Sequence, residues 1–207
     1  MKGTIIDLHV HTRPYSHCSR MSLREVLNNL DPQIEGIGIT NHDTKEGIPY
    51  SARSGQTKEG ETILIPGVEI TTSEGDIIAF GISALPPKRS TPKRVIKIIH
   101  DEGGVAIAAH PFRTGFKFAE LENLEWDAIE VNGKSSRREN KQIKQLARLL
   151  DLPIVGGSDG HSIKDLNSCV TVFKHVARSP DDVVHQIKRG DCYASWFSSI
   201  KRYNGDF

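Results

Sequence analysis

The sequence has few cysteines, no long apolar run and almost no net charge. Its three cysteines, Cys18, Cys169 and Cys192, are widely spaced and odd in number, which is typical of a reduced protein rather than a disulfide framework. No apolar run reaches the length of a membrane-spanning helix, and the first residues become polar too soon for a signal peptide. The formal net charge of +1 indicates no general attraction to nucleic acid or membranes, although a local basic patch is not excluded. We therefore expect a cytoplasmic protein.

The 207 residues, 37% of them hydrophobic, suffice for one domain that spans residues 1–207. No internal repeat or low-complexity segment interrupts the chain. Residues 44–61 are polar and rich in glycine, and we expect them to form a mobile loop that could shape a pocket.

Short apolar runs alternate with helical patterns along the chain. Capping-box pairs predict helices after Ser22 and Ser136, and Ser/Thr-Pro pairs predict helices after Thr91 and Ser179. Most of the apolar runs are nearly continuous, which is typical of strands covered on both faces. The predicted strands are residues 3–10, 36–41, 62–71, 76–82, 104–110, 128–132, 153–159 and 168–174. This alternation predicts parallel β/α units.

Residue types that bind metals recur where these strands end. One histidine at a strand end is usually only a hydrogen-bonding residue, but several at the same end of neighbouring strands indicate a site. The side chains in question are His9, His11, His42, Glu69, His110, Glu130, Asn132, Asp159 and His161. In parallel β/α proteins, the carboxyl ends of the strands are where functional sites form.

A set of histidines and carboxylates without a cysteine cluster favours Zn, Mn or Fe bound for hydrolysis. The candidates are too many for one tetrahedral ion, so two or three divalent ions are expected, with Glu69 able to bridge them. A bridging hydroxide would attack the substrate, and phosphate esters are the natural substrate class for such a centre. Arg113, three residues after His110, could bind a phosphate, with Lys134 and Arg137 flanking the same end.

The motifs "DLHVHT", "ITNHDT", "GVEIT", "AAHPF", "EVNG" and "GSDGH", in this order, resemble the polymerase and histidinol phosphatase (PHP) family across residues 5–162. The resemblance implies a distorted seven-stranded β/α barrel, a TIM-like (βα)7 fold, with a trinuclear metal site that hydrolyses phosphoester bonds. It implies three sets of ligands: His9, His11, Glu69 and Asp159; then His42, His161 and a residue after "HVHT"; then Glu69 and His110. It also implies that Asn132 and Glu130 lie near the substrate, and that His161 or a neighbour protonates the leaving oxygen.

The sequence departs from the family pattern at three points. In the loop "RPYSHCSRMS", either His17 or Cys18 could supply the missing ligand, and the spacing from His11 favours His17. Asp76 stands where many members carry a histidine for the third ion, so that ion's occupancy is open. Asn41 stands where aspartate is common, which changes the support beside His42.

The leading function is a metal-dependent phosphoesterase acting on a small phosphomonoester, a nucleotide or the end of an oligonucleotide. The near-zero net charge favours a small substrate over a long polyanion. One alternative is an amidohydrolase-like enzyme that cleaves a C–N or carboxyl ester bond at the same site. The other is a metal-bound scaffold module without turnover.

Overall fold

The computed structural model describes residues 3–49, 58–59 and 62–204. Its sheet has ten strands, in the order β10-β9-β1-β2-β4-β5-β6-β7-β8, with β3 paired to β4. The strands are β1 (Ile5–Val10), β2 (Gly36–Ile39), β3 (Lys58–Glu59), β4 (Thr62–Thr71), β5 (Asp76–Phe80), β6 (Val105–Ala108), β7 (Ala128–Asn132), β8 (Ile154–Gly157), β9 (Cys169–Phe173) and β10 (Cys192–Trp196). Of the predicted mobile loop at 44–61, residues 50–57 and 60–61 lie outside the described part of the chain.

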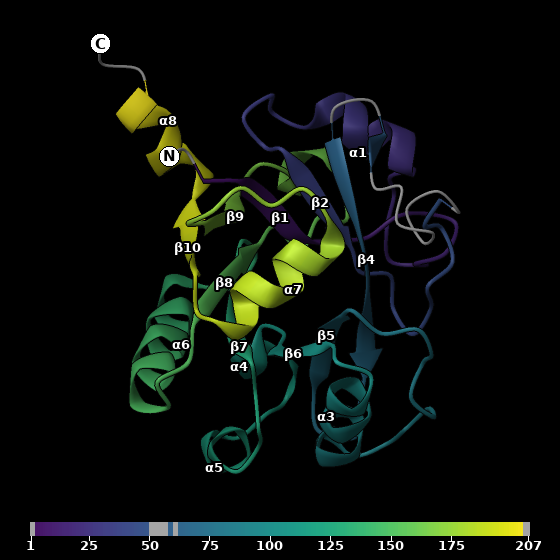
Figure 1. The fold of residues 1–207 in the computed structure, drawn as a ribbon, viewed down its shortest axis with the longest axis vertical. Helices are drawn as coiled ribbons and strands as arrows, with labels where there is room; N and C mark the ends of the chain where they lie inside the picture. Colours follow the sequence, from purple (N-terminus) through teal and green to yellow (C-terminus); the bar gives the residue numbers. More distant parts are fainter. Residues whose placement is uncertain (1–2, 50–57, 60–61, 205–207) are drawn as a thin grey trace.

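The helices surround this sheet, as Figure 1 shows for α1, α3, α6 and α7. They are α1 (Leu23–Asn29), α3 (Pro92–Asp101), α4 (Pro111–Thr114), α5 (Phe118–Glu122), α6 (Arg137–Leu149), the 3₁₀ turn η1 (Ile163–Asp165), α7 (Pro180–Lys188) and α8 (Phe197–Asn204). The four helices predicted from the sequence are α1, α3, α6 and α7. Ser22 and Ser136 each accept a hydrogen bond from the backbone of the residue three positions later, as their capping boxes predict.

The sheet is mixed, and this corrects the expectation of seven β/α units. Strands β1, β2 and β4 run parallel, as do β6, β7 and β8. Strand β5 is antiparallel to both β4 and β6, and β9 is antiparallel to β1 and β10. A continuous apolar run indicates burial on both faces but carries no information on strand direction, so the sequence could not reveal these reversals.

The two ends of the sheet approach each other, so the sheet is nearly closed into a barrel. Strand β8 lies against β1, β9 and β10. Val10 and Gly160 form a parallel bridge, in which Gly160 N donates to His9 O at 3.2 Å and His11 N donates to Gly160 O at 3.0 Å. This closure brings the carboxyl end of β1 beside the residues that follow β8. It also buries one cluster of strand side chains, including Ile6, Leu8, Ile65 and Phe80.

Within the described residues, no helix is both long and apolar enough to span a membrane.

Candidate metal centre

Nine side chains that can bind metal gather at the carboxyl ends of β1, β2, β4, β6 and β8 and in the adjoining loops. They form four overlapping groups, and within each group the ligand atoms lie within 4.8 Å of one another. The first position combines two overlapping groups, His9 with His11 and Glu69, and His9 with His110 and Asp159. The second group is His11, Cys18, His42 and His161, and the third is Glu69, Asp76 and His110. Residues far apart in sequence therefore meet where the strands end, as expected for a β/α architecture.

The ligand atoms of four side chains converge on one point; these are His9, His11, Glu69 and Asp159. His9 Nε2 lies 2.9 Å from His11 Nε2, and Glu69 Oε2 lies 3.2 Å and 3.1 Å from these two nitrogens. Asp159 Oδ1 lies 3.5 Å from His9 Nε2 and 3.3 Å from His11 Nε2. Ligand atoms bound at zinc distances in a tetrahedron lie about 3.3 Å apart. The spacing of the four side chains fits one divalent ion.

The same residues are buried and strongly charged. His9, His11, Glu69 and Asp159 are each at most 1% exposed. Asp159 Oδ1 is buried without a hydrogen bond to any described residue, although nitrogens of His9, His11 and His161 lie 3.2–3.5 Å from it. Burial opposes ionisation of Glu69, but the neighbouring histidines outweigh it and hold the pKa of Glu69 well below its usual range. A buried carboxylate oxygen without a donor fits a metal ligand, because burial without a partner is costly.

Cys18, not His17, completes the second group, which corrects the preference drawn from the sequence. The turn hydrogen bonds from Ser16 N to Thr12 O and from Ser19 N to Ser16 O direct Ser16 inward, while His17 and Cys18 are both exposed. Cys18 lies with His11, His42 and His161. The ring of His11 lies 4.7 Å from that of His42 and 4.3 Å from that of His161.

The electrostatics of this group favour a thiolate. Burial opposes ionisation of Cys18, but hydrogen bonds with His161 and His42 outweigh it and lower the pKa of its thiol to about 5. The pKa of His42 is raised to about 9, because the hydrogen bond with Cys18 and the charge of Glu69 outweigh its burial. Thiolate and imidazole together are ligands that zinc prefers.

The third group is built around Glu69, whose Oε1 lies 2.9 Å from His110 Nε2. Asp76 joins it from the start of β5. Burial and the charge of Glu69 raise the pKa of Asp76. Aspartate therefore reaches the place where the family resemblance implied a histidine.

Glu130, which the family resemblance placed near the substrate, lies behind His9 and His110. It is 1% exposed, and both of its carboxylate oxygens are used. Oε1 lies 2.7 Å from His9 Nδ1, while Oε2 accepts hydrogen bonds from His110 N at 2.9 Å and Asn132 Nδ2 at 3.1 Å. The carboxylate of Glu130 therefore orients the ligand His9, which is a common arrangement behind metal-binding histidines.

Asn132 is also buried, and its side chain contacts Arg113. Asn132 Oδ1 accepts from Arg113 Nη1 at 3.3 Å and from Lys134 N at 2.8 Å. Arg113 Nη2 also donates to Asp159 Oδ2, the oxygen that faces away from His9 and His11. Arg113 is thus held at the edge of the centre, as predicted, and Asn132 acts by positioning it.

The centre opens to solvent on one side. The side chains of His42, His161 and Arg113 are 37%, 20% and 30% exposed, whereas His9 and His11 are fully buried. Lys134 reaches the same side, with its Nζ 2.6 Å from His161 Nδ1. A substrate would therefore approach past His42, His161, Arg113 and Lys134.

Two of the ligands have unusual backbone conformations. His110 has φ of 28° and ψ of 55°, and Asp159 has φ of 54°. Residues other than glycine seldom adopt this left-handed region, and such strain is often found at functional sites. Gly157 also has a spatial role, because a Cβ there would come within 2.4 Å of His9 Cβ.

The sequence reasoning gave no role to Ser16 and Asp7. Ser16 Oγ lies 3.1 Å from His11 Nδ1 and accepts a hydrogen bond from His42 N at 3.2 Å. Asp7 Oδ1 accepts hydrogen bonds from His9 N and from Ser158 N. The position of Asp7, two residues before His9 on the same face of the strand, was a signal for it. The contacts of Ser16 could not be predicted from the sequence, because they depend on how the loop folds.

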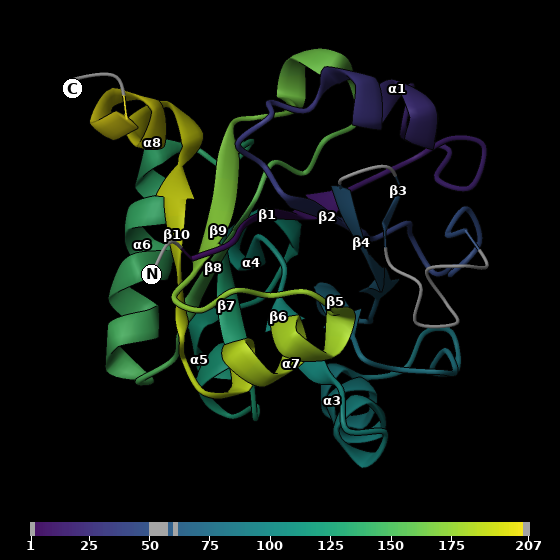
Figure 2. The same cartoon turned by 45° about the horizontal axis from the view of Figure 1, so that its top comes forward.

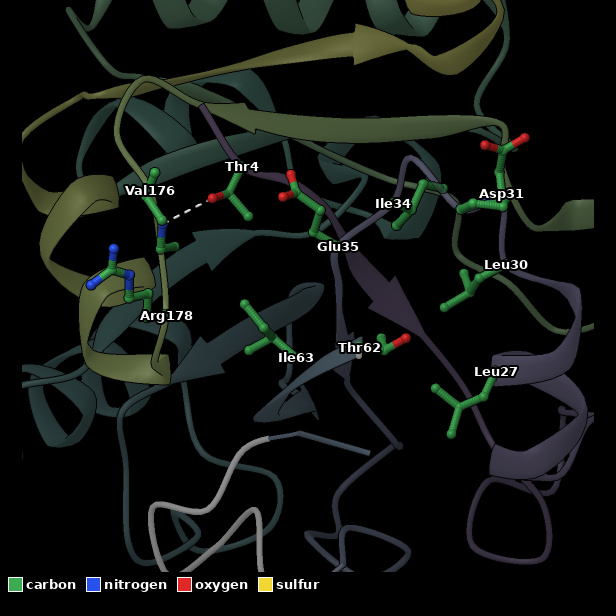
Figure 3. Close-up of a pocket in the computed structure, with 12 residues that line it drawn as sticks. Thr4, Leu27, Leu30, Asp31, Ile34, Glu35, Thr62, Ile63, Val176 and Arg178 are labelled. Atoms are coloured by element: carbon green, nitrogen blue, oxygen red, sulfur yellow. Dashed lines mark hydrogen bonds between the residues drawn. The ribbon is translucent and has the colours of Figure 1, made fainter. Parts of the chain in front are cut away.

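A cavity of about 830 Å³ lies at the opposite, amino-terminal ends of β1, β2 and β4 (Figure 3). Leu27, Leu30, Ile34 and Ile63 line it, and at its edge Ala177 N donates to Thr4 Oγ1 at 2.9 Å. None of the ligand groups described above contributes to it. The cavity is separate from the metal centre.

Comparisons with known proteins identify a family and relatives of this chain. The sequence profile of a family described as PHP-associated matches residues 137–192. An uncharacterised protein of Methanocaldococcus jannaschii is 33% identical over 138 residues, which cover 60% of this chain and 79% of that protein. The chain belongs to the PHP family. The match with the archaeal protein gives this PHP protein a relative in sequence, but not an activity.

Solved structures show the same fold at 17% identity. PsfC from Pseudomonas syringae has a TM-score of 0.75, with 99% of this chain and 98% of that chain covered. A proposed metal-dependent phosphoesterase from Bifidobacterium adolescentis has a TM-score of 0.60, with 76% and 87% covered. An amidohydrolase from Chromobacterium violaceum, solved with sulfate and without metal, has a TM-score of 0.58, with 75% and 87% covered. The PHP protein thus shares its fold with proteins named for two kinds of hydrolysis.

Proposed function

We propose that this PHP protein is a metal-dependent phosphoesterase. The observation that carries the proposal is the position of Glu69, which belongs to the first and third ligand groups and lies 3.3 Å from His42 of the second. One carboxylate shared in this way suits a cluster of ions rather than a single ion. Arg113 and Lys134 add two cations on the side that opens to solvent.

The donor set suits two or three divalent ions. His9, His11, Glu69 and Asp159 would hold one; His42, His161 and Cys18 a second; and Glu69, Asp76 and His110 a third. The Cys18 thiolate favours zinc in the second group, whereas the carboxylates of the third group also suit manganese or iron. Such ions would lower the pKa of bound water and neutralise charge on the substrate's oxygens.

The chain's own side chains would bind and orient the phosphate. Arg113 uses one N–H toward Asp159 and one toward Asn132, so its remaining donors are available to a phosphate oxygen. His161 Nδ1 lies 2.7 Å from Asp159 O, which would leave Nε2 directed at the second group. Because both ring nitrogens of His161 would then be used, we propose its neighbour Lys134, whose Nζ lies 2.6 Å from His161 Nδ1, as the proton donor to the leaving oxygen. The substrate would be a small phosphomonoester, a nucleotide or the end of an oligonucleotide.

An amidohydrolase-like activity is the second candidate, because one protein of the same fold is an amidohydrolase. The same ligands could serve it. The two cations at the open side favour a phosphate, however, because an uncharged amide or ester gains little from Arg113 and Lys134.

A cytoplasmic location stays a prediction.

The test is elemental analysis of the purified protein together with hydrolysis of an aryl phosphate, an aryl ester and an aryl amide, before and after chelation. His11→Ala removes a buried ligand. His175→Ala is the matched control, because His175 is an exposed histidine outside the ligand groups.

Bound metal, together with aryl phosphate hydrolysis that chelation and His11→Ala abolish and His175→Ala leaves intact, would support the proposal. Hydrolysis of the ester or amide alone would favour the amidohydrolase. Metal without any hydrolysis would favour a scaffold. A protein that takes up no metal, even when incubated with zinc or manganese, would overturn all three.

A further inference from the structure

A groove of about 710 Å³ lies between α6 and the junction of β10 with α8. Figure 2 shows α6 and α8 on the same side of the molecule. Arg137, Lys141 and Lys144 line the groove from α6, Trp196 from the end of β10, and Gly133 and Ser135 from the turn that precedes α6. No acidic residue lines the groove within the described part of the chain. The groove is not part of the metal centre, although it begins one residue after Asn132.

The three cations form a positively charged row. Arg137, Lys141 and Lys144 are exposed and follow one another at intervals of four and three residues, so they share one face of α6. They span about 10 Å along the helix axis, which is longer than one phosphate group. None of them forms an ion pair with a described residue. Their charges are therefore available to an anion that extends along the groove.

A basic helix face is often only a solvated surface, but Ser135 points to a ligand. Ser135 is 8% exposed, and its Oγ is buried without a hydrogen-bond partner among the described residues. Buried hydroxyl groups are nearly always hydrogen-bonded, because burial without a partner is costly. A ligand oxygen in the groove would supply the missing partner.

Trp196 adds an aromatic surface to the same groove. It is half-buried and packs against the hydrophobic cluster beneath α6, so its ring is held in place by the core. Aromatic rings fixed next to a row of cations are how proteins bind single-stranded nucleic acid, with bases stacked on the ring and phosphates on the cations. A phosphate chain without bases would gain nothing from Trp196.

The turn between β7 and α6 joins the groove to the metal centre. Asn132 Oδ1 contacts Arg113, which faces the centre, and the next residues are Gly133, Lys134 and Ser135. Lys134 reaches His161 in the centre, whereas Ser135 lines the groove. A chain with one phosphate at the centre could thus continue into the groove.

We propose that this groove binds the part of a single-stranded oligonucleotide that extends from the phosphate held at the metal centre. Arg137, Lys141 and Lys144 bind its phosphates, Ser135 donates to one of them, and a base stacks on Trp196. The proposal rests on the proposed function for the identity of the scissile group, but its binding test does not require turnover.

The test measures binding of a fluorescein-labelled hexathymidylate with phosphorothioate linkages to the metal-loaded protein at several salt concentrations. Lys141→Ala/Lys144→Ala removes two charges from the groove. Arg138→Ala/Arg148→Ala is the matched control, because it removes two exposed charges from the same helix outside the groove. Ser135→Ala and Trp196→Ala probe the other two contacts, and Trp196→Phe keeps an aromatic ring.

We expect the lysine pair variant to bind at least tenfold more weakly and the slope of log K against log salt to fall by about 1.4. The arginine pair variant should bind like the wild type at matched salt. Trp196→Ala should weaken binding about tenfold, and Trp196→Phe should retain most of it. Ser135→Ala should weaken binding without lowering thermal stability, because its hydroxyl has no partner to lose within the described protein.

Equal binding by the two double variants, or equal affinity for a duplex of the same length, would overturn the proposal that the groove binds a single-stranded oligonucleotide. Hydrolysis of an aryl phosphate by the same preparations separates the two proposals. Binding that depends on the groove, without this hydrolysis, would support the groove proposal and overturn the phosphoesterase proposal. Hydrolysis with groove-independent binding would do the reverse.

Discussion

His9 Nδ1 lies 2.7 Å from Glu130 Oε1, and this contact directs His9 Nε2 toward His11, Glu69 and Asp159. The Glu130 carboxylate also holds the backbone N–H of His110, a second ligand from another strand. One buried side chain outside the ligand groups thus contacts two candidate ligands. We therefore propose that Glu130 acts in the assembly of the centre.

Glu130→Gln should therefore weaken metal binding. Replacing the partner of a ligating histidine costs about 10- to 100-fold in metal affinity. Competition with a chelator of known affinity would measure this change. Glu139→Gln, on the exposed start of α6, is the control. A higher KM with unchanged metal affinity would instead mean that Glu130 contacts the substrate.

Glu69 and Asp76 should differ in how much metal their loss removes. Glu69 belongs to two ligand groups, whereas Asp76 belongs only to the third. Glu69→Gln should lose most of the bound metal, and Asp76→Ala should lose at most one equivalent by elemental analysis. If Asp76→Ala released all of the metal, the three-group arrangement would be wrong.

Cys18 should react with iodoacetamide in the metal-free protein far below the pH at which ordinary thiols react. Its pKa is lowered to about 5, because His161 and His42 stabilise the thiolate despite partial burial. The thiol of Cys192 is the internal control, because burial raises its pKa to about 12. Mass spectrometry of the alkylated peptides would follow both residues.

Zinc should protect Cys18 from this alkylation if the thiolate is a ligand. Cys18→Ser should lose up to one equivalent of metal, and His17→Ala should lose none. Alkylation at the same rate with and without zinc would remove Cys18 from the ligand set.

Asp7 should make the free energy of unfolding depend on pH in the metal-free protein. Burial, only partly offset by hydrogen bonds from Ser158 and His9, raises the pKa of Asp7 to about 6. The unfolded value is about 3.9, so between these values the folded state binds more protons and its stability falls as pH rises. The shift corresponds to roughly 3 kcal/mol.

In denaturant titrations with chelator present, the free energy of unfolding of the wild type relative to Asp7→Asn should therefore fall by this amount between about pH 4 and about pH 6. Asp101→Asn, an exposed aspartate on α3, should show no such change relative to the wild type. Parallel pH profiles for the wild type and Asp7→Asn would contradict the raised pKa.

The sequence predicts eight of the strands, the helices α1, α3, α6 and α7, and the side of the sheet that carries the centre. Local signals suffice for this: Ser22 and Ser136 mark helix starts, and His9, His42 and His110 follow apolar runs. The sequence does not predict β3, β10, α4, α5 or α8. Nor does it predict the antiparallel β5, because the run from Asp76 to Phe80 would be equally apolar in either direction.

The same limit explains the errors in the site. His17 and Cys18 are adjacent and both exposed, and only the fold of the turn at residues 12–19 places Cys18, not His17, beside the other ligand atoms. Glu130 and Arg113 both carry charge near a strand end, but their burial and partners depend on residues such as Asp159, which lies 46 positions after Arg113. Such contacts cannot be predicted from the spacing of residues along the chain.

His110 and Asp159 hold ligand side chains on a left-handed backbone, which costs about 1–3 kcal/mol at each residue. Glycine at either position would relax the chain and remove a ligand. Glycine at these two positions would therefore raise the stability of the fold and weaken metal binding. Selection for heat resistance alone, in the absence of metal, would be expected to erode the centre at these residues first.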